Sequence, residues 1–398
     1  MSFSSLPLRP FHPHPSRRTA RGFTLVELMI SIALSLGLIA VMLTVYQSTR
    51  AAAKRQEQLS ELQQGVRTAF EYLATDARMI GHRGCFTRRA SGLSFPGLTA
   101  GTLDTNYQLG VEGFDFALTG NALPMTSANP TDDTDASNWT ANGAAAPAIA
   151  NLPLDTVSGS GLGLTPGSDV LVIRSVVGQP VRLTLDPATS GSSTTLTLQN
   201  TGARCSNGVD GLSGFCAGSH GLIANCTAAQ FFTVPAAPAG NTMVTGNALV
   251  ATYTTAAEVF PVHTVAYYVK RGTSGTGPSL YRRVFDGTTA GGLEEELIDG
   301  VETMQVQYGI DSNADNIRDG NYVTASAVTN WDTVMTVRVS LLMRTTDQLE
   351  GGNALANSAT VGGVAVTYPV DADDKRTDRF DRQVFTTTIA LRNRIAYF

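Results

Sequence analysis

Oxygen-bearing side chains cluster in the stretch DSNADNIRDG, where Asp311, Asn313, Asp315 and Asp319 occupy positions 1, 3, 5 and 9 of a loop. Oxygen ligands at alternate positions of a turn can converge on Ca²⁺, as they do in EF-hand loops. The pattern is incomplete, because position 6 is asparagine instead of glycine and position 12 is tyrosine instead of glutamate. Aspartate and asparagine also favour solvated turns between strands. The sequence therefore raises calcium binding as a hypothesis, with a solvated turn as its alternative.

The four cysteines are Cys85, Cys205, Cys216 and Cys226, and no two of them form a C-x-x-C pair. This spacing argues against a zinc knuckle or a thioredoxin-type site. If the body of the chain lies outside the cytoplasm, an even count favours disulfides. Four cysteines allow three pairings, and the sequence leaves all three open. We guess that Cys205–Cys216 closes a surface loop and that Cys85–Cys226 pins a globular head to a long helix.

The sequence contains no motif of a known catalytic site. It has no G-x-S-x-G elbow, no H-E-x-x-H pair and no P-loop, and the glycine-rich stretch at 159–163 follows no clear strand–helix unit. Ser219 and His220 lie in a cysteine-containing loop without an evident acid partner. We therefore expect a structural protein, not an enzyme, with no cofactor apart from the calcium hypothesis.

Glu27 is the only charged residue in an apolar run from Phe23 to Tyr46. A helix of about 24 residues spans about 36 Å, which is enough to cross a hydrocarbon layer of about 30 Å. A lone carboxylate at that depth costs about 2.5–3.5 kcal/mol, so it needs a partner. A cleaved secretory signal has a shorter apolar region, and a plain signal anchor leaves the glutamate unexplained. A glutamate that snorkels to the interface is a further simple alternative.

The distribution of charge is uneven along the 398 residues, whose net charge is −5. Four arginines and no acid precede the apolar run, so the rest of the chain is more acidic than the net charge suggests. The positive-inside rule then leaves the N-terminus in the cytoplasm and the body outside. An acidic body also lacks the basic face that nucleic-acid binding needs, so we expect no direct nucleic-acid site.

Helical periodicity continues beyond the apolar run. Residues 47–80 contain no proline and carry apolar side chains at spacings of three and four, up to Gly81. This stripe predicts one helix over 23–80, transmembrane in about 23–46, whose second half packs on a head formed by 81–398. The stripe consists of Leu59, Leu62, Val66, Ala69, Leu73, Ala77 and Ile80.

The rest of the chain is predicted to be rich in strands. Residues 87–167 have little periodicity and many turn-forming residues, so we expect a long loop or insertion there. Later β-branched runs predict one mostly antiparallel sheet, which gives an α+β fold. These runs are SDVLVIRSV, VRLTLD, TTLTLQ, QFFTV, ALVATYT, TVAYYVKR, LYRRVF, ETMQVQYGID, DTVMTVRVSLLMRT and QVFTTTIALRN.

The segment RGFTLVELMI resembles the class III leader site of type IV pilins and pseudopilins. The resemblance implies that residues 1–22 are a leader and that a prepilin peptidase cuts between Gly22 and Phe23. It also implies that the enzyme methylates the new amine of Phe23. In the family, the glutamate at the position of Glu27 pairs with the N-terminal amine of a neighbouring subunit, and the fold is lollipop-like, with a long helix and a C-terminal antiparallel β-sheet head.

The runs VAYYVKR, SLYRRVF, ELIDGVETMQVQYGID and IALRNR, with MIGHRGC at 79–85, resemble PilW-type minor pilins. The resemblance implies a single-pass inner-membrane protein with a periplasmic head that later enters the pilus fibre at the cell surface. Such a minor pilin helps prime assembly of the type IV pilus, in a complex with other minor pilins and the major pilin at the base or tip. A tip adhesin is a further expected partner, and adhesion and twitching motility are the expected consequences.

Two other functions are weighed against the minor pilin. A pseudopilin of a type II secretion system shares the leader and the glutamate. A membrane-anchored periplasmic enzyme or binding module would need a site in the head that the sequence does not reveal.

Overall fold

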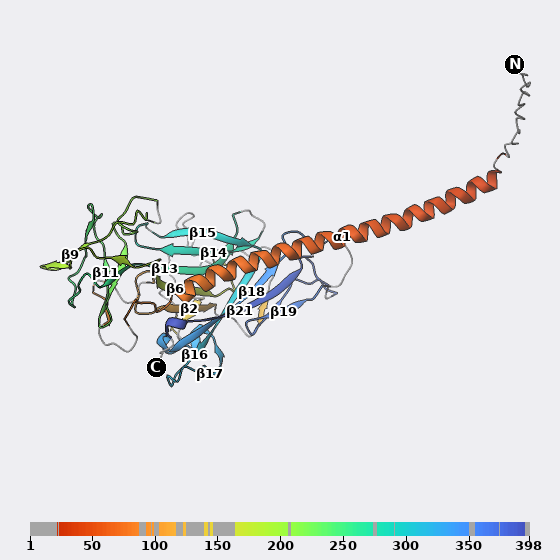
Figure 1. Ribbon diagram of the computed structural model, residues 1–398. Helices are drawn as coiled ribbons and strands as arrows, with labels where there is room; N and C mark the ends of the chain where they lie inside the picture. Colours follow the sequence, from red (N-terminus) through yellow and green to blue (C-terminus); the bar gives the residue numbers. More distant parts are fainter. Residues whose placement is uncertain are drawn as a thin grey trace, which may run out of the picture. The chain divides into compact units, whose positions relative to one another are not determined.

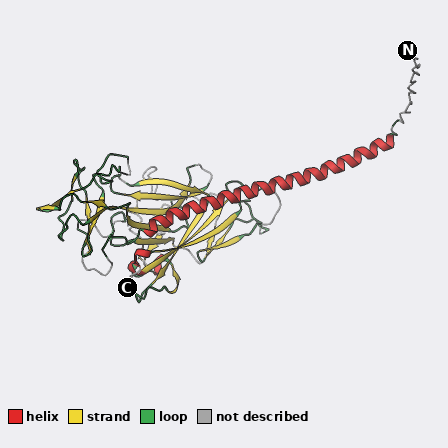
Figure 2. Ribbon diagram, viewed as in Figure 1, coloured by secondary structure: helices red, strands yellow, loops and turns green. Residues whose placement is uncertain are grey.

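The computed structural model describes residues 22, 24–86, 93–96, 98, 103–116, 122–124, 139–141, 144–145, 164–205, 208–273, 277–289, 291–349, 355–373 and 375–394. The chain divides into two compact units, residues 1–54 and 55–398, and their boundary falls within one helix. After that helix, strands supply most of the regular structure (Figure 2). The predicted α+β fold class, with one long N-terminal helix followed by antiparallel sheets, is confirmed.

Helix α1 (Leu25–Arg78) has 54 residues, close to the predicted range of 23–80. It begins two residues later than predicted because Thr24 caps its first turn from outside the helix. Gly81 follows its end with a φ of +77°, a left-handed conformation that favours glycine. In the first unit, the apolar side chains of residues 25–46 are exposed. By length and composition, α1 is the one helix in the described residues that could cross a membrane.

The apolar stripe on the second half of α1 is buried as predicted. Leu62, Val66, Ala69, Leu73 and Ala77 are at most 6% exposed, and they pack in the largest core of the second unit. Strands from two sheets supply the other side of this core, as can be followed where the end of α1 runs along them (Figure 1). Each fully buried leucine or valine contributes about 1.5–3 kcal/mol, so this stripe fixes the helix end on the sheets.

The larger sheet has 11 strands, and its longest strand pairs with four others. Its pairs are antiparallel, apart from one short parallel pair at the edge. Its main path runs in the order β1 (Leu93–Ser94), β11 (Ala229–Thr233), β10 (His220–Ala224), β13 (Glu258–Arg271), β6 (Val170–Val176), β2 (Val111–Phe116), β4 (Trp139–Ala141) and β5 (Ala144–Ala145). Three strands lie off this path. β7 (Val181–Arg182) and β14 (Pro278–Phe285) pair with β13, and β15 (Leu293–Asp299) pairs with β14.

A second sheet of four antiparallel strands covers the other part of the core. Its order is β17 (Asp319–Val323), β16 (Val301–Ile310), β18 (Val334–Arg344) and β21 (Arg382–Ala390). Smaller elements complete the described part of the second unit: β12 (Thr242–Val244), β9 (Ser193–Thr197) and β8 (Ala188–Ser190) in one sheet, β19 (Ser358–Val361), β20 (Val364–Thr367) and β3 (Ala122–Pro124) in another, and the 3₁₀ turns η2 (Ala325–Ala327), η3 (Trp331–Thr333) and η4 (Arg392–Arg394).

Three predictions about the strands need correction. The head contains several sheets where one was predicted. The region 87–167 was predicted as a loop or insertion, yet β2 lies inside the larger sheet and pairs with β6. The run ALVATYT at 248–254 forms no strand. Its amides are bound by side chains instead, since Leu249 N–H donates to Thr194 Oγ1 over 3.0 Å and Val250 N–H to Gln230 Oε1 over 2.7 Å.

Candidate functional site

Gly22, on one side of the predicted cleavage site, lies in exposed chain shortly before α1. Gly22 is exposed and non-helical, and a Cβ atom added to it would meet no atom within 4 Å. The backbone at Gly22 is therefore open to a protease. Phe23 lies outside the described residues, so cleavage between Gly22 and Phe23 and methylation of Phe23 stay predictions.

Thr24 and Glu27 form a capping box at the start of α1. The Glu27 N–H donates to Thr24 Oγ1 over 3.3 Å, while the Thr24 N–H and hydroxyl both donate to Glu27 Oε2, over 3.4 and 3.3 Å. Each side chain satisfies an amide that the helix leaves unpaired. Sequence reasoning missed this role of Thr24, although threonine three residues before glutamate and ahead of an apolar run is its usual signal.

The capping box gives Glu27 a function in the isolated chain besides the predicted pairing with an amine. A carboxylate at a helix N-terminus is favoured by the positive end of the helix dipole. The hydrogen bonds of 3.3–3.4 Å are long, and a carboxylate accepts about four, so Glu27 keeps acceptor capacity for a further donor. The capping box thus holds the Glu27 carboxylate at the first turn of α1, four positions along the sequence from Phe23.

Asp76 anchors the other end of α1 to the larger sheet. Tyr267 on β13 donates its hydroxyl to Asp76 Oδ2 over 2.6 Å, and Arg282 on β14 donates Nε to the same oxygen over 3.0 Å. Burial and the neighbouring carboxylate raise the pKa of Tyr267, so its hydroxyl stays a donor. A negative charge near a helix C-terminus is unfavourable, because the helix dipole is negative there. The ion pair with Arg282 offsets this repulsion and the cost of burying the Asp76 carboxylate.

We expect Asp76→Ala to destabilise the second unit by about 3 kcal/mol, because it leaves Arg282 and the Tyr267 hydroxyl without their shared partner. The measurement is urea unfolding of the full chain in detergent. Glu71→Ala, an exposed acid on the same helix, is the matched control and should change stability by less than about 0.5 kcal/mol. Equal effects of both substitutions would contradict the anchoring role.

The C-terminal run ALRNR, residues 390–394, contacts the end of α1. The Asn393 side chain donates Nδ2 to the Arg78 carbonyl over 2.8 Å, which satisfies one of the carbonyls that a helix leaves unpaired. Arg394 is buried and binds the carbonyl of Trp331. A side chain at Gly81 would approach Arg394 Cγ to 3.2 Å, so glycine also makes room for this contact. The run that resembled PilW-type minor pilins therefore closes the head against the helix end.

The structure joins Cys85 to Cys226 and Cys205 to Cys216, the two pairs guessed from the sequence. Cys85 follows the end of α1, while Cys226 follows β10, so the first bridge links the helix end to the larger sheet. The second closes a loop of 11 residues in sequence separation, against 141 for the first. A longer closed loop restricts the unfolded chain more strongly.

Loss of the long bridge is expected to cost more than loss of the short one. By the chain-entropy relation, Cys85→Ser with Cys226→Ser should destabilise by about 5 kcal/mol, and Cys205→Ser with Cys216→Ser by about 3 kcal/mol. Urea unfolding of the two double variants under oxidising conditions measures this order. A reversed order would show that the native state around the short loop matters more than chain entropy.

The four residues of the calcium hypothesis bind their own loop. Asp311 accepts the N–H groups of Asp315 and Asn316 over 3.2 and 3.0 Å, and Asp319 accepts both donors of Ser312 at 2.7 and 2.6 Å. Asn313 donates to Asp315 over 3.0 Å. Among the described residues, no group of three or more histidine, cysteine or acidic side chains is placed to hold a metal.

Calcium binding stays a prediction with a direct test. If the loop binds Ca²⁺, the ion at about 100 times its dissociation constant stabilises the chain by about 2.7 kcal/mol. Thermal unfolding of the full chain with millimolar Ca²⁺ measures this, and Asp311→Asn with Asp315→Asn should remove the shift. No shift at millimolar Ca²⁺, or the same shift in the double variant, would leave the solvated turn as the correct interpretation.

A buried ionic cluster, here called the Glu302 network, joins three strands of the second sheet to the segment before β21. The Glu302 carboxylate on β16 accepts hydrogen bonds from Arg382 Nε and Nη2 over 2.6 and 2.8 Å. The guanidinium group of Arg344 lies 3.5 Å from the same carboxylate. The Asp378 carboxylate also accepts hydrogen bonds from Arg382, from Nη1 over 2.7 Å and from Nη2 over 2.8 Å. Asp378 forms a further ion pair with Arg376. The side chains of Glu302 and Arg382 are 1% exposed, so the network is shielded from water.

Two family models match the chain. Residues 17–44, which contain the predicted cleavage site and Glu27, match the prokaryotic N-terminal methylation motif. A class III leader followed by an apolar helix and an antiparallel β-rich head defines a membrane-anchored, type IV pilin-like component. Such a leader implies processing by prepilin peptidase and interaction with other pilins.

The second match is to Type IV Pilus-assembly protein W, PilW, over residues 266–393. With the leader, it indicates a type IV pilin-like minor component of the PilW type. This family is a structural component of pilus assembly and not an enzyme family. The match spans all members of the Glu302 network and the Asn393 cap. No curated protein and no solved structure matches the chain.

Proposed function

We propose that this chain is a minor pilin that helps prime assembly of the type IV pilus. It acts in a complex with other minor pilins and the major pilin, at the base or tip of the fibre. Its head stands in the periplasm before assembly and at the cell surface afterwards. An adhesin at the tip is a further partner, and adhesion and twitching motility depend on the complex.

The observation that carries this proposal is the presence of a class III leader and PilW-type strands in one chain. The leader alone is shared with the pseudopilins of type II secretion systems, whereas the strands over 266–393 favour the pilus. The exposed apolar surface of residues 25–46 supports the proposal, because such a helix needs lipid or other helices around it.

Deletion of the gene tests the proposal in the cell. We expect loss of surface pili and of twitching motility, unchanged secretion of exoproteins, and recovery when the wild-type gene is restored. Sheared pili from the restored strain should contain the processed chain at a small fraction of the major pilin. Lost secretion with normal pili would instead assign the chain to a type II secretion system.

A further inference from the structure

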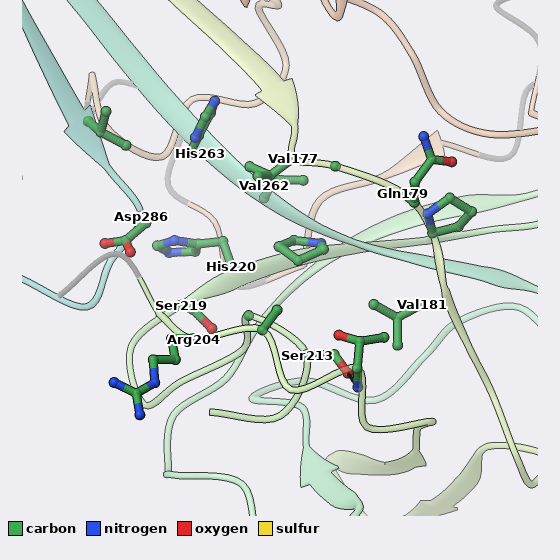
Figure 3. Close-up of a pocket in the computed structure, with 17 residues that line it drawn as sticks. Val177, Gln179, Val181, Arg204, Ser213, Ser219, His220, Val262, His263 and Asp286 are labelled. Atoms are coloured by element: carbon green, nitrogen blue, oxygen red, sulfur yellow. Dashed lines mark hydrogen bonds between the residues drawn. The ribbon is translucent and has the colours of Figure 1, made fainter. Parts of the chain in front are cut away.

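A pocket of about 440 Å³ lies in the second unit, and α1 contributes no residue to its wall. Its walls are the turn between β6 and β7, the loop closed by Cys205–Cys216, the start of β10, the middle of β13 and the end of β14. Figure 3 shows side chains from these segments around one space. One polar atom of the wall, His220 Nδ1, has no hydrogen-bond partner, but it is buried and a molecule in the pocket cannot reach it. We therefore assign the pocket no ligand.

Strand β21 forms one edge of the second sheet. It pairs with β18 on one side and, in the described part of the chain, with no strand on the other. Its nine residues follow β18 in an antiparallel register without a shift. The register continues beyond both ends of β21. The Thr345 N–H donates to the Asp381 carbonyl over 2.9 Å, before the strand. The Leu391 N–H donates to the Met335 carbonyl over 2.7 Å, after it.

Every second residue of β21 turns its backbone groups away from β18. Because Asp381 and Leu391 bond to the β18 side, the odd-numbered residues between them do so too, and the even-numbered residues face the open edge. The N–H and carbonyl groups at this edge have no partner among the described residues. They belong to Arg382, Val384, Thr386, Thr388 and Ala390. The open edge is about 27 Å long, at about 3.4 Å per residue.

The other edges of the described sheets are protected against a further strand. β15 carries Glu294, Glu295 and Glu296 in succession, and its pairing with β14 is irregular. β17 has five residues, and its pairing with β16 is irregular as well. The remaining edge strands have four residues or fewer; they are β1, β3, β5, β7, β8, β12 and β19. Short length, charge and bulges are the usual means by which a protein prevents pairing at an edge.

The edge at β21 has none of these protections. From Gln383 to Ala390 the strand contains no charged residue, no proline and no bulge. Val384 is 37% exposed, and Phe385, which packs on the core, is only partly buried at this edge. A long, regular and uncharged edge is a template for pairing with another chain. Its contrast with the protected edges indicates that β21 is kept open for a partner.

A second copy of this chain is a poor source of the partner strand. Arg55 of α1 donates to Asp381 over 3.0 Å, and Asn393 donates to the Arg78 carbonyl over 2.8 Å, so β21 runs in the same direction as α1. An antiparallel pair of two β21 strands would therefore place the two Arg55 residues at opposite ends of the joint sheet. Two chains anchored in one membrane enter their heads from the same side. A parallel pair avoids this conflict, but parallel pairing is weaker.

We propose that the open edge of β21 binds an extended strand of a different protein, which is uncharged and rich in threonine and valine. This strand adds a fifth strand to the second sheet. Backbone hydrogen bonds along the edge supply the affinity. Cross-strand pairs with Val384, Thr386 and Thr388 favour β-branched side chains, and a charge in the partner strand would meet no opposite charge on them. The inference uses the membrane anchor but not the role in priming, so it and the proposed function can fail independently.

A synthetic peptide tests the proposal. The probe has about nine residues of alternating threonine and valine, a fluorescent label, a polyethylene glycol tail for solubility, and a methyl group on every second amide nitrogen. This methylation leaves one pairing edge and prevents the peptide from stacking on itself. Fluorescence anisotropy with the purified full chain in detergent measures binding. The same peptide with every amide methylated keeps the side chains but lacks donors, and it should bind at least about tenfold more weakly. Glutamate in place of the central residue should also weaken binding.

Variants of β21 locate the binding. Thr386→Pro removes an N–H of the open edge and leaves the bonds to β18 in place, so it should weaken binding by at least about tenfold. Thr386→Val keeps that N–H and should bind as the wild type does. Thr388→Pro repeats the test at a second outward position, and urea unfolding checks that each variant is folded.

Four results would overturn the proposal. They are no binding of the probe, equal binding of the partly and fully methylated peptides, binding that survives both proline substitutions, and a purified chain that dimerises through β21. Disulfide cross-linking of Thr386→Cys between two copies detects such a dimer and would assign the edge to a second copy of the chain.

Discussion

Glu27→Gln will leave cleavage after Gly22 intact and will reduce the processed chain in sheared pili by at least about tenfold. Glutamine can replace glutamate in a capping box, so this substitution preserves the start of α1 while it removes the charge. If Glu27 pairs with the amine of a neighbouring subunit, the lost ion pair weakens docking by more than about 1.4 kcal/mol, which corresponds to that tenfold change.

Three further variants complete the experiment. Glu27→Ala removes both the charge and the cap and should be at least as defective as Glu27→Gln. Glu57→Ala, an exposed acid farther along α1, should behave as wild type. Gly22→Leu should block cleavage itself. Mass spectrometry of the membrane fraction reports cleavage, and immunoblotting of sheared pili reports assembly. Normal assembly of Glu27→Gln would mean that Glu27 serves as a helix cap without an intersubunit role.

Glu302→Gln is expected to destabilise the second unit by about 3–5 kcal/mol, because it leaves buried guanidinium groups without their shared carboxylate. Arg344 on β18 and Arg382 on β21 are directly opposite each other in the sheet. Their two positive charges repel each other unless a negative charge lies between them. Glu302 on β16 supplies that charge to both. The ring of Phe380 lies over Arg344 at 4.3 Å, so water has little access to screen the repulsion.

Urea unfolding of the full chain measures this effect. Glu295→Gln, an exposed acid on β15, makes the same chemical change and should shift stability by less than about 0.5 kcal/mol. A double variant, Glu302→Gln with Arg382→Met, should recover part of the loss, since it removes one of the two stranded charges. A loss below about 1 kcal/mol for Glu302→Gln would show that the arginines find other partners.

The sequence predicted those parts of the fold that follow from periodicity. Spacings of three and four located the buried face of α1 from Leu62 to Ala77, and β-branched runs located the long strands β13, β16 and β18. Both patterns arise because one face of an element must be apolar to pack. Glu27 was singled out on energetic grounds, because a charge in an apolar run is unusual, whereas the leader was expected from the resemblance of RGFTLVELMI to pilin leaders.

Strand β2 escaped prediction because two of its residues have special contacts. A Cβ atom at Gly113 would overlap the hydroxyl of the buried Tyr308, so only glycine fits there. Asp115 accepts the N–H groups of Ala325 and Ser326, at 2.9 and 2.7 Å, and so caps η2. Glycine and aspartate are depleted in strands, so their presence at 111–116 was interpreted as loop.

Ion pairs between distant residues were outside the reach of the sequence. Asp76 and Arg282 are 206 positions apart, and Glu302 and Arg382 are 80 apart. In a single chain, each acid has many possible bases, and only the fold selects one. The pocket beside His220 was missed for the same reason, since its walls come from five separate segments.

The contact between Asn393 and Arg78 has a consequence for biosynthesis. The carbonyl of Arg78, the last residue of α1, obtains its hydrogen-bond partner from Asn393, which lies 315 positions later in the chain. The C-terminal strand of the second sheet must therefore leave the ribosome before the head can close around α1. We expect chains stalled or truncated before residue 382 to stay sensitive to proteases, because folding of this head waits until translation is almost complete.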